Sequence, residues 1–399
     1  MDKVNTDKNK VEELLTRGVD KIYPSKEFLE KELTSGRRLR IYQGFDPTGS
    51  KLHIGHMVGL RKHRQWQDMG HEVIFLVGDG TGQAGDPSGK KKTREKFFTQ
   101  EELRANAVDY LSQASKVVRF DGPNPIKIMY NSDWLNKLTL VDILGIAQNF
   151  SVQQLIERDM FQERIKNQET INLREFLYPL LQGYDSVAMD VDLELGGSDQ
   201  TFNMLAGRTL MKAIKNKEKF VMTTPLLADS KGVKIGKSEG NVIGLTDEPS
   251  DLYGKIMSLG DEAIIPMFTL LTDTPIGDIE AFDIKKNPME LKKRVAQIIV
   301  ATLHSEEAAQ EASDSFANTF QKNEIPEDVQ IIKVAPGDLL IDVLSKEGIV
   351  SSKSDFRRLV DEGAITNLDQ DEKINSHTAE AGAGVYRIGK KRFCKIELR

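Results

Sequence analysis

The chain has 399 residues, of which 39% are hydrophobic and 29% charged, and its formal net charge is −6. This composition is typical of a soluble globular protein with two or three domains, and it excludes a surface coated in basic residues. Cys394 is the one cysteine, which excludes an internal disulfide framework and fits a reducing compartment. Residues 1–15 are charged and lack the apolar core of a signal peptide, and no run of 18 apolar residues predicts a membrane span. We therefore expect a cytoplasmic protein with no membrane partner.

Residues 1–36 predict an N-terminal segment of short charged helices. Strand and helix patterns then alternate, with strands at 37–45, 71–79 and 126–132 and helices at 54–69 and 101–118. The second strand is apolar throughout from Val73 to Val77, as expected when helices cover both faces of a sheet. A helix-rich interval and a further strand at 191–197 follow. We predict a doubly wound, parallel α/β sheet of the Rossmann type over residues 37–247.

The C-terminal part of the sequence predicts two further domains. Residues 248–320 carry helical patterns with few strand signals, and we interpret them as a separate helical domain. The polar stretch at 321–336 predicts a linker. Residues 337–399 combine two helical segments with short strands, which predicts a small α+β domain.

The motif HIGH places His53 and His56 three residues apart at the start of a predicted helix, with Gly55 between them. Zinc binding on one helix favours a spacing of four and needs a third ligand, which the sequence does not suggest. Two histidines with satisfied hydrogen bonds are one interpretation. Phosphate binding is the other, because a helix N-terminus offers N–H donors to an anion and glycine permits close approach.

A glycine-rich segment, GTGQAGDPSGKKKTREK, follows the second strand. It matches G-x-G-x-x-G, but the apolar helix that should follow in a dinucleotide site is missing. It also resembles a Walker A loop, from which Ala84 and Lys91 depart. A solvated surface loop is one interpretation, and a basic clamp on phosphates that includes Lys90 and Arg94 is the other.

Two later motifs also combine polar groups with a defined spacing. In KIGKS, Lys234 and Lys237 either belong to a solvated turn or reach a polyphosphate as compact charges. In YPLLQGYD, the residues Tyr178, Gln182 and Asp185 share one helix face. Such a stripe is usually exposed, but its apolar neighbours predict burial, and a buried carboxylate needs a partner that a ligand could supply.

HIGH followed by KIGKS in a doubly wound fold resembles the class I aminoacyl-tRNA synthetases, whose second motif is KMSKS. Ile235 and Gly236 depart from that motif, whereas both lysines are kept. The segments YQGFDPTGSKLHIGH, GDPSGK, YNSDW, YPLLQGYD and GGSDQ occur in the order typical of bacterial tyrosyl-tRNA synthetases. SKSDFRRLVDEGAITN resembles an S4-type RNA-binding domain, so the resemblance covers the chain from about Tyr42 to its end.

The resemblance implies roles for the residues that match these motifs. Those that would bind the substrate tyrosine are Tyr42 and Asp185 at its phenol, Asp86, Tyr178 and Gln182 at its ammonium group, and Gln200 near its carboxylate. Those that would bind ATP are Gly55, Gly197 and Asp199, with Asp46 near the nucleotide. Those that would contact the phosphates during catalysis are His53, His56, Lys90, Arg94, Lys234 and Lys237.

The reaction implied is the activation of L-tyrosine by ATP, accompanied by Mg²⁺, followed by transfer of tyrosine to the 3′ end of tRNA(Tyr). Because the attacking carboxylate is already ionised, alignment and charge stabilisation would carry the first step. The resemblance also implies a homodimer, and we expect no prosthetic group, dedicated metal site or DNA partner. The rivals are a tryptophanyl-tRNA synthetase and a non-catalytic RNA-binding protein. Tyr42 together with Gln182 and Asp185, and the S4-like tail, favour the tyrosyl enzyme over the tryptophanyl one.

Overall fold

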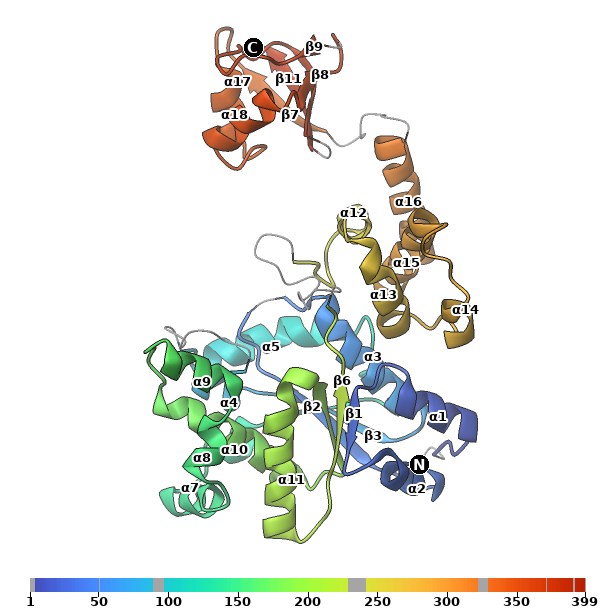
Figure 1. The fold of residues 1–399 in the computed structure, drawn as a ribbon, viewed down its shortest axis with the longest axis vertical. Coiled ribbons are helices and arrows are strands. Elements are labelled where there is room, and N and C mark those ends of the chain that lie inside the picture. Colours follow the sequence, from blue (N-terminus) through green and yellow to red (C-terminus); the bar gives the residue numbers. More distant parts are fainter. Residues whose placement is uncertain are drawn as a thin grey trace. The chain divides into compact units, whose positions relative to one another are not determined.

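The computed structural model describes residues 4–49, 51–88, 97–228, 242–321, 329–370, 372–389 and 392–398. Internal contacts divide the chain into two compact units, Met1–Ala309 and Gln310–Arg399. Figure 1 shows the helices and strands of both units.

A six-stranded sheet forms the centre of the first unit, with the order β1-β6-β5-β2-β3-β4. The strands are β1 (Lys21–Tyr23), β2 (Arg40–Phe45), β3 (Glu72–Val77), β4 (Lys127–Tyr130), β5 (Leu193–Gly197) and β6 (Phe220–Thr224). All neighbours pair in parallel except β1, which pairs antiparallel with β6 at the edge. The predicted parallel sheet is present, and the N-terminal segment, predicted as helical only, adds an edge strand to it.

The chain order reverses beside β2, and this reversal creates the place for a ligand. From β2 the chain winds outward to β3 and β4, and it then returns to β5 on the other side of β2. In open α/β sheets, ligands bind at the carboxyl ends of the two strands that flank such a reversal. Here these ends are Phe45 and Gly197.

Helices cover the sheet, and polar caps define where several of them begin (Figure 1). They are α1 (Lys8–Thr16), α2 (Lys26–Thr34), α3 (Ile54–Asp68), α4 (Thr81–Ala84), α5 (Gln100–Ala114), α6 (Ser132–Leu135), α7 (Leu140–Ala147), α8 (Val152–Ile156), α9 (Asp159–Lys166), α10 (Leu173–Met189), η1 (Ser198–Gln200) and α11 (Thr201–Lys215). At α10, the Asn172 side chain accepts from a backbone N–H while Glu175 binds back to the Asn172 N–H, which is a capping box. Residues Val73–Val77 of β3 are all buried, as their sequence predicts.

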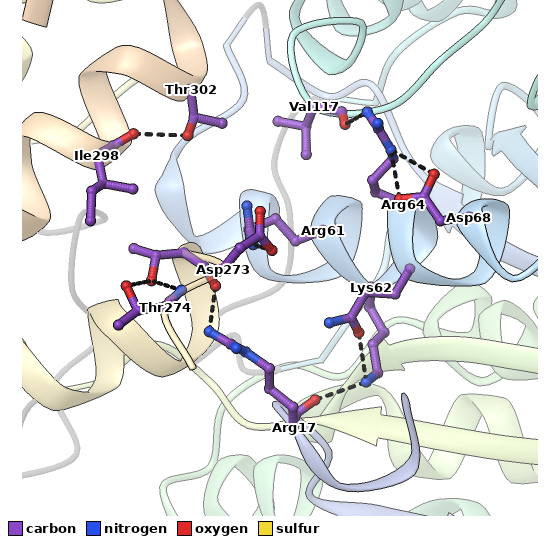
Figure 2. Close-up of polar contacts among 12 residues, drawn as sticks. Arg17, Arg61, Lys62, Arg64, Asp68, Val117, Asp273, Thr274, Ile298 and Thr302 are labelled. Carbon is purple, nitrogen blue, oxygen red and sulfur yellow. Dashed lines mark hydrogen bonds and ion pairs between the residues drawn. The ribbon is translucent and has the colours of Figure 1, made fainter. Parts of the chain in front are cut away.

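The last part of the first unit is helical and packs against α3. Its elements, the last of which runs on into the second unit, are α12 (Pro249–Met257), η2 (Asp261–Ala263), α13 (Ile264–Leu271), α14 (Ile276–Glu280), α15 (Pro288–Leu303) and α16 (Glu306–Gln321). Arg17 donates to the carbonyl of Thr272, just after α13, at 2.5 Å, while Arg61 of α3 pairs with Asp273 (Figure 2). Lys62 of α3 donates to the carbonyl of Arg17 at 2.8 Å. Arg61 and Lys62 therefore connect α3 to the residues that follow α13 and α1.

The second unit contains a five-stranded sheet with the order β7-β11-β10-β8-β9. Its elements are β7 (Gln330–Val334), α17 (Leu340–Lys346), α18 (Lys353–Asp361), β8 (Ile365–Asn367), β9 (Glu372–Lys373), β10 (Gly384–Ile388) and β11 (Arg392–Leu398). Residues 330–334 lie in the stretch predicted as a linker, yet they pair in parallel with β11 and bury Ile332 and Val334. The sheet therefore begins before Gly337, and Cys394 is part of its core.

Among the residues that the structure describes, no helix has both the length and the apolar composition needed to cross a bilayer.

Candidate active site

A cavity of about 370 Å³ opens at the carboxyl ends of β2 and β5. The predicted site residues that line it are Tyr42, Asp46, His53, Gly55, His56, Asp86, Tyr178, Gln182, Asp185, Gly197, Asp199 and Gln200. They come from β2, α3, α10, β5 and the connections between them. Residues up to 158 positions apart in the sequence, such as Tyr42 and Gln200, therefore meet in one cavity because the chain reverses at this point.

His53 and His56 cap the N-terminus of α3 with their ring nitrogens. Nδ1 of His53 accepts from the Gly55 N–H at 3.1 Å, and Nδ1 of His56 accepts from the His53 N–H at 3.1 Å. In a neutral imidazole, an accepting Nδ1 places the proton on Nε2. Both interpretations of HIGH are therefore compatible, because the same two rings can be satisfied caps and donors toward a ligand in the cavity that they line.

Gly55 is required where the two histidines meet. A Cβ at this position would lie 2.9 Å from Nδ1 of His53, so any side chain would displace the ring that caps the helix. The centroids of the His53 and His56 rings are 4.0 Å apart. Glycine thus keeps the helix N-terminus open and both rings in position.

Asp185 of α10 lies at the buried end of the cavity and is 1% exposed. Its two carboxylate oxygens accept from Trp134 Nε1 at 2.8 Å and from Asn131 Nδ2 at 3.0 Å. Burial raises the pKa of Asp185 well above its usual range, and these two hydrogen bonds partly oppose the shift. Asn131 and Trp134 were not predicted as site residues, although both belong to YNSDW, one of the motifs that carry the resemblance.

Tyr42 faces the same end of the cavity from β2 and is fully buried. Its hydroxyl group lies 2.9 Å from Oγ of Ser186, with which it shares a hydrogen bond. Burial, followed by the nearby negative charge of Glu194, raises the pKa of Tyr42 well above its usual range. The phenol therefore stays protonated and can act as a donor.

Asp46 and Tyr178 are in direct contact, although the resemblance assigns one to the nucleotide and the other to the ammonium group. The Tyr178 hydroxyl donates to Oδ2 of Asp46 at 2.8 Å, and Thr81 donates to Oδ1 at 2.7 Å. Thr81 also lines the cavity, and it was not predicted as a site residue. The Asp46 carboxylate thus joins Tyr178 of α10 to Thr81 of α4 within the cavity lining.

Asp86 and Gln200 form a second set of polar contacts, which joins the segment after α4 to the segment after β5. Gln200 donates through Nε2 to Oδ2 of Asp86 at 2.9 Å, while Asn203 of α11 donates to Oε1 of Gln200 at 2.8 Å. Oδ1 of Asp86 accepts from the Ser88 N–H at 2.9 Å. These contacts fix both predicted residues in the orientation in which they line the cavity.

Lys90, Arg94, Lys234 and Lys237 lie outside the residues that the structure describes. The described residues that precede each of these segments line the cavity. Thr224 and Leu227 line it before residues 229–241, and Ile243 accepts from the Ile54 N–H at 3.0 Å after them. Ser88, which lines the cavity, precedes residues 89–96.

Comparison with known proteins matches this chain to one family. Residues 34–321 match the family of tRNA synthetases class I (W and Y). The chain is 42% identical to the tyrosine–tRNA ligase of Colwellia psychrerythraea, over 98% of this chain and 100% of that protein. It is 41% identical to that of Geobacter metallireducens, over 97% and 98% of the two chains.

The chain belongs to the tyrosine–tRNA ligase family of class I synthetases. The predicted family is therefore confirmed. Solved structures of tyrosyl-tRNA synthetases share the fold. The mitochondrial synthetase of Aspergillus nidulans is 24% identical with a TM-score of 0.65, and it covers 78% of this chain and 94% of its own. The synthetase of Archaeoglobus fulgidus, solved with L-tyrosine, is 20% identical with a TM-score of 0.61, over 76% and 99%.

The described residues contain no group of three or more His, Cys, Asp or Glu side chains placed to hold a metal ion. His53 and His56 act instead as helix caps in this structure.

Proposed function

We propose that the cavity binds L-tyrosine and ATP side by side and that the protein charges tRNA(Tyr) with tyrosine, as its family does. The observation that carries this proposal is the pair Tyr42 and Asp185 at the buried end of a cavity whose mouth is a helix N-terminus. A buried carboxylate that accepts from one amide and one indole N–H still has lone pairs for a third donor, which a phenol supplies.

The tyrosine substrate would lie with its phenol between Tyr42 and Asp185. Its ammonium group would meet Asp86, Tyr178 and Gln182, which line the cavity. Gln200 would then lie near the carboxylate. Phenylalanine would leave Asp185 desolvated and without its hydroxyl partner, so the same groups that bind tyrosine would reject its closest analogue.

ATP would lie over the N-terminus of α3, as its Mg²⁺ complex with phosphate oxygens among the metal ligands. The Nε2–H groups of His53 and His56 would donate to the phosphates and ribose. Gly197 and Asp199 would meet the ribose, near Asp46. Lys234 and Lys237 would approach the pyrophosphate from one side, and Lys90 and Arg94 from the other.

In the first step, a tyrosine carboxylate oxygen attacks the α-phosphorus, and the bond from that phosphorus to the β-phosphate bridging oxygen breaks. The products are tyrosyl-adenylate and pyrophosphate, and the step needs no general base because the carboxylate is ionised. Donors that bind the pyrophosphate more tightly in the transition state raise the rate. In the second step, a terminal ribose hydroxyl of the tRNA takes the tyrosyl group and AMP leaves.

The S4-like second unit and the helical region after residue 248 would bind the tRNA. On α18, Arg357 and Arg358 are exposed, and Lys395 is exposed on β11. Such cations bind a phosphate backbone in a salt-dependent manner. Because tRNA charging serves protein synthesis, we expect the protein to work in the cytoplasm.

A homodimer is the second part of the proposal. Leu140, Val141 and Leu144 on α7 are 71%, 77% and 60% exposed, and Leu173 at the start of α10 is 76% exposed. Exposed apolar side chains gathered on neighbouring elements favour contact with another protein surface. Light scattering on the pure protein should give twice the mass of the 44.8 kDa chain.

Pyrophosphate exchange with each of the twenty amino acids tests the proposed function directly. We expect exchange with tyrosine alone at low substrate concentration. Exchange with tryptophan would favour the tryptophanyl enzyme, and no exchange at all would favour a non-catalytic RNA-binding protein. A chain truncated after residue 321, which removes β7 with the sheet that it completes, should keep exchange and lose tRNA charging.

A further inference from the structure

A buried ion pair lies directly behind the cavity, and no step of the proposed reaction uses it. Lys219, the residue before β6, is 0% exposed and pairs with Glu194 of β5, which lines the cavity. Nζ of Lys219 also donates to Oγ of Ser186 at 2.8 Å and to the carbonyl of Met204 at 3.1 Å. Replacing such a pair with apolar side chains is often neutral or stabilising, so stability alone does not explain it.

The ammonium group sets the direction of a chain of hydroxyl groups. Lysine can only donate, so Ser186 must accept from Lys219 through Oγ. The proton of Ser186 can then go to the Tyr42 oxygen at 2.9 Å, which is much closer than Glu194 Oε2 at 3.5 Å. With its oxygen occupied in this way, the Tyr42 O–H can donate to a phenol in the cavity that Tyr42 lines.

Glu194 sets the direction of a second group in the same manner. A carboxylate only accepts, and Oε1 of Glu194 accepts from Nε2 of Gln182 at 2.9 Å. This contact fixes which end of the Gln182 amide is the nitrogen. Its Oε1 is then the atom available to a donor such as an ammonium group.

We propose that Lys219 is a positioning residue for amino acid recognition, acting through two branches that both begin at its ammonium group. One branch runs through Ser186 and Tyr42 to the substrate phenol, whose own O–H donates to Asp185. The other runs through Glu194 and Gln182 to the substrate ammonium group. In the first branch, every hydrogen bond donates in the same direction, from the buried ammonium group of Lys219 to the buried carboxyl group of Asp185. Hydrogen bonds in such a chain strengthen one another. This inference rests on the proposed binding of tyrosine.

The packing of α10 against α11 leaves room for this cluster. A Cβ at Gly207 of α11 would collide with Nζ of Lys219 and would lie 2.7 Å from Oγ of Ser186. Burial lowers the pKa of Lys219, while the charge of Glu194 opposes the shift. Glycine at 207 therefore keeps the ammonium group in contact with both of its branches.

The two branches predict different effects on tyrosine and phenylalanine, because only tyrosine carries a phenol. Ser186→Ala removes the hydroxyl group that links Lys219 to Tyr42, and it leaves the second branch in place. We expect kcat/KM for tyrosine in pyrophosphate exchange to fall about tenfold, through KM, while the weak exchange with phenylalanine and the KM for ATP stay unchanged. Equal losses for the two amino acids would overturn the phenol branch.

The double variant Lys219→Gln with Glu194→Gln removes both charges and leaves no unpaired buried ion. We expect kcat/KM to fall about 100-fold for tyrosine and about tenfold for phenylalanine, since both branches are cut. Lys217→Gln is the matched control, because Lys217 pairs with Asp190 and Asp192 outside the cavity, and it should change neither value.

The outcomes separate this inference from the proposed function. If the ratio of kcat/KM for tyrosine to kcat/KM for phenylalanine is unchanged in both test variants, the positioning role of Lys219 is refuted and the proposed function still stands. Absence of tyrosine-dependent exchange in the unmodified protein would refute the function itself. If the double variant fails to fold, as judged by its circular dichroism melt, the Ser186→Ala result decides for or against the phenol branch.

Discussion

The two ends of the cavity are built in different ways. At the end proposed to bind tyrosine, Tyr42 and Asp185 are almost completely buried, and each has hydrogen-bond partners from another element. At the end proposed to bind the nucleotide, His53 and His56 are partly exposed, and Nδ1 of each ring accepts from the backbone of their own helix turn. Long-range packing thus fixes the first pair of side chains, and a local cap orients the second pair.

This difference matches the function that we propose for each end of the cavity. Selecting one amino acid requires polar groups that are costly to leave unpaired, and that cost is large only where water is excluded. Stabilising charge on a leaving pyrophosphate requires donors that tighten during the reaction. Changes at the tyrosine end should therefore alter substrate choice, and changes at the nucleotide end should alter rate.

The largest effect is expected from Asp185→Ala at the tyrosine end. The change removes the acceptor for the substrate phenol and leaves Asn131 and Trp134 without their partner. We expect kcat/KM for tyrosine in pyrophosphate exchange to fall at least about 100-fold. The binding of ATP, measured by calorimetry without tyrosine, should be unchanged. Equal loss of both would contradict the assignment of this end.

Lys234→Ala and Lys237→Ala test the nucleotide end with the opposite expected pattern. We expect each to lower the rate of adenylate formation about tenfold or more, because each removes a cation from the leaving pyrophosphate. The Kd for tyrosine should stay close to that of the unmodified protein. Stopped-flow fluorescence measures both quantities, and a collapse of tyrosine affinity would count against this role.

A smaller effect is expected at His56, where two substitutions separate the cap from the ligand contact. His56→Asn keeps an acceptor near the position of Nδ1, which caps the His53 N–H. His56→Gln instead keeps a donor near the position of Nε2. We expect the Gln variant to retain more adenylation activity, with the Asn variant about tenfold slower. Higher activity in the Asn variant than in the Gln variant would mean that the cap alone matters.

The smallest effect is expected in the pH dependence of the free energy of unfolding, and it arises from His63. His63 of α3 is fully buried beside Phe45, and its ring nitrogens have no hydrogen-bond partner among the described residues. Burial lowers the pKa of His63 to about 3. Between its unfolded pKa of about 6.5 and that value, the unfolded chain binds more protons, so the free energy of unfolding falls as pH falls.

His63→Leu should remove this dependence. Relative to the variant, the unmodified protein should lose up to about 1.4 kcal/mol of unfolding free energy per pH unit on going below pH 6.5. Above that pH, the difference between the two should be constant. Urea unfolding of both proteins at several pH values measures this, and parallel curves would show that His63 does not titrate on unfolding.

Sequence periodicity was sufficient for β2 to β5 and for the helices α3 and α5, because buried strands such as Val73–Val77 are continuous apolar runs. It was insufficient for β1, β6 and β7. Three residues, Lys21–Tyr23, are too few to show a period, and their pairing with β6 is formed across the fold. In β7, one exposed isoleucine, Ile331, interrupts the alternation that the buried residues would otherwise show.

The sequence by itself determined the chemical types in the site and their local spacing: two histidines around a glycine, a polar stripe on one helix face, and a family resemblance that the comparisons confirm. Only the tertiary structure decided which groups pair. Asp185 with Trp134, Asp46 with Tyr178, and Lys219 with Ser186 each join separate elements. The reason is that a cap depends on residues within one turn, whereas a buried hydrogen bond depends on which strands and helices the fold brings together.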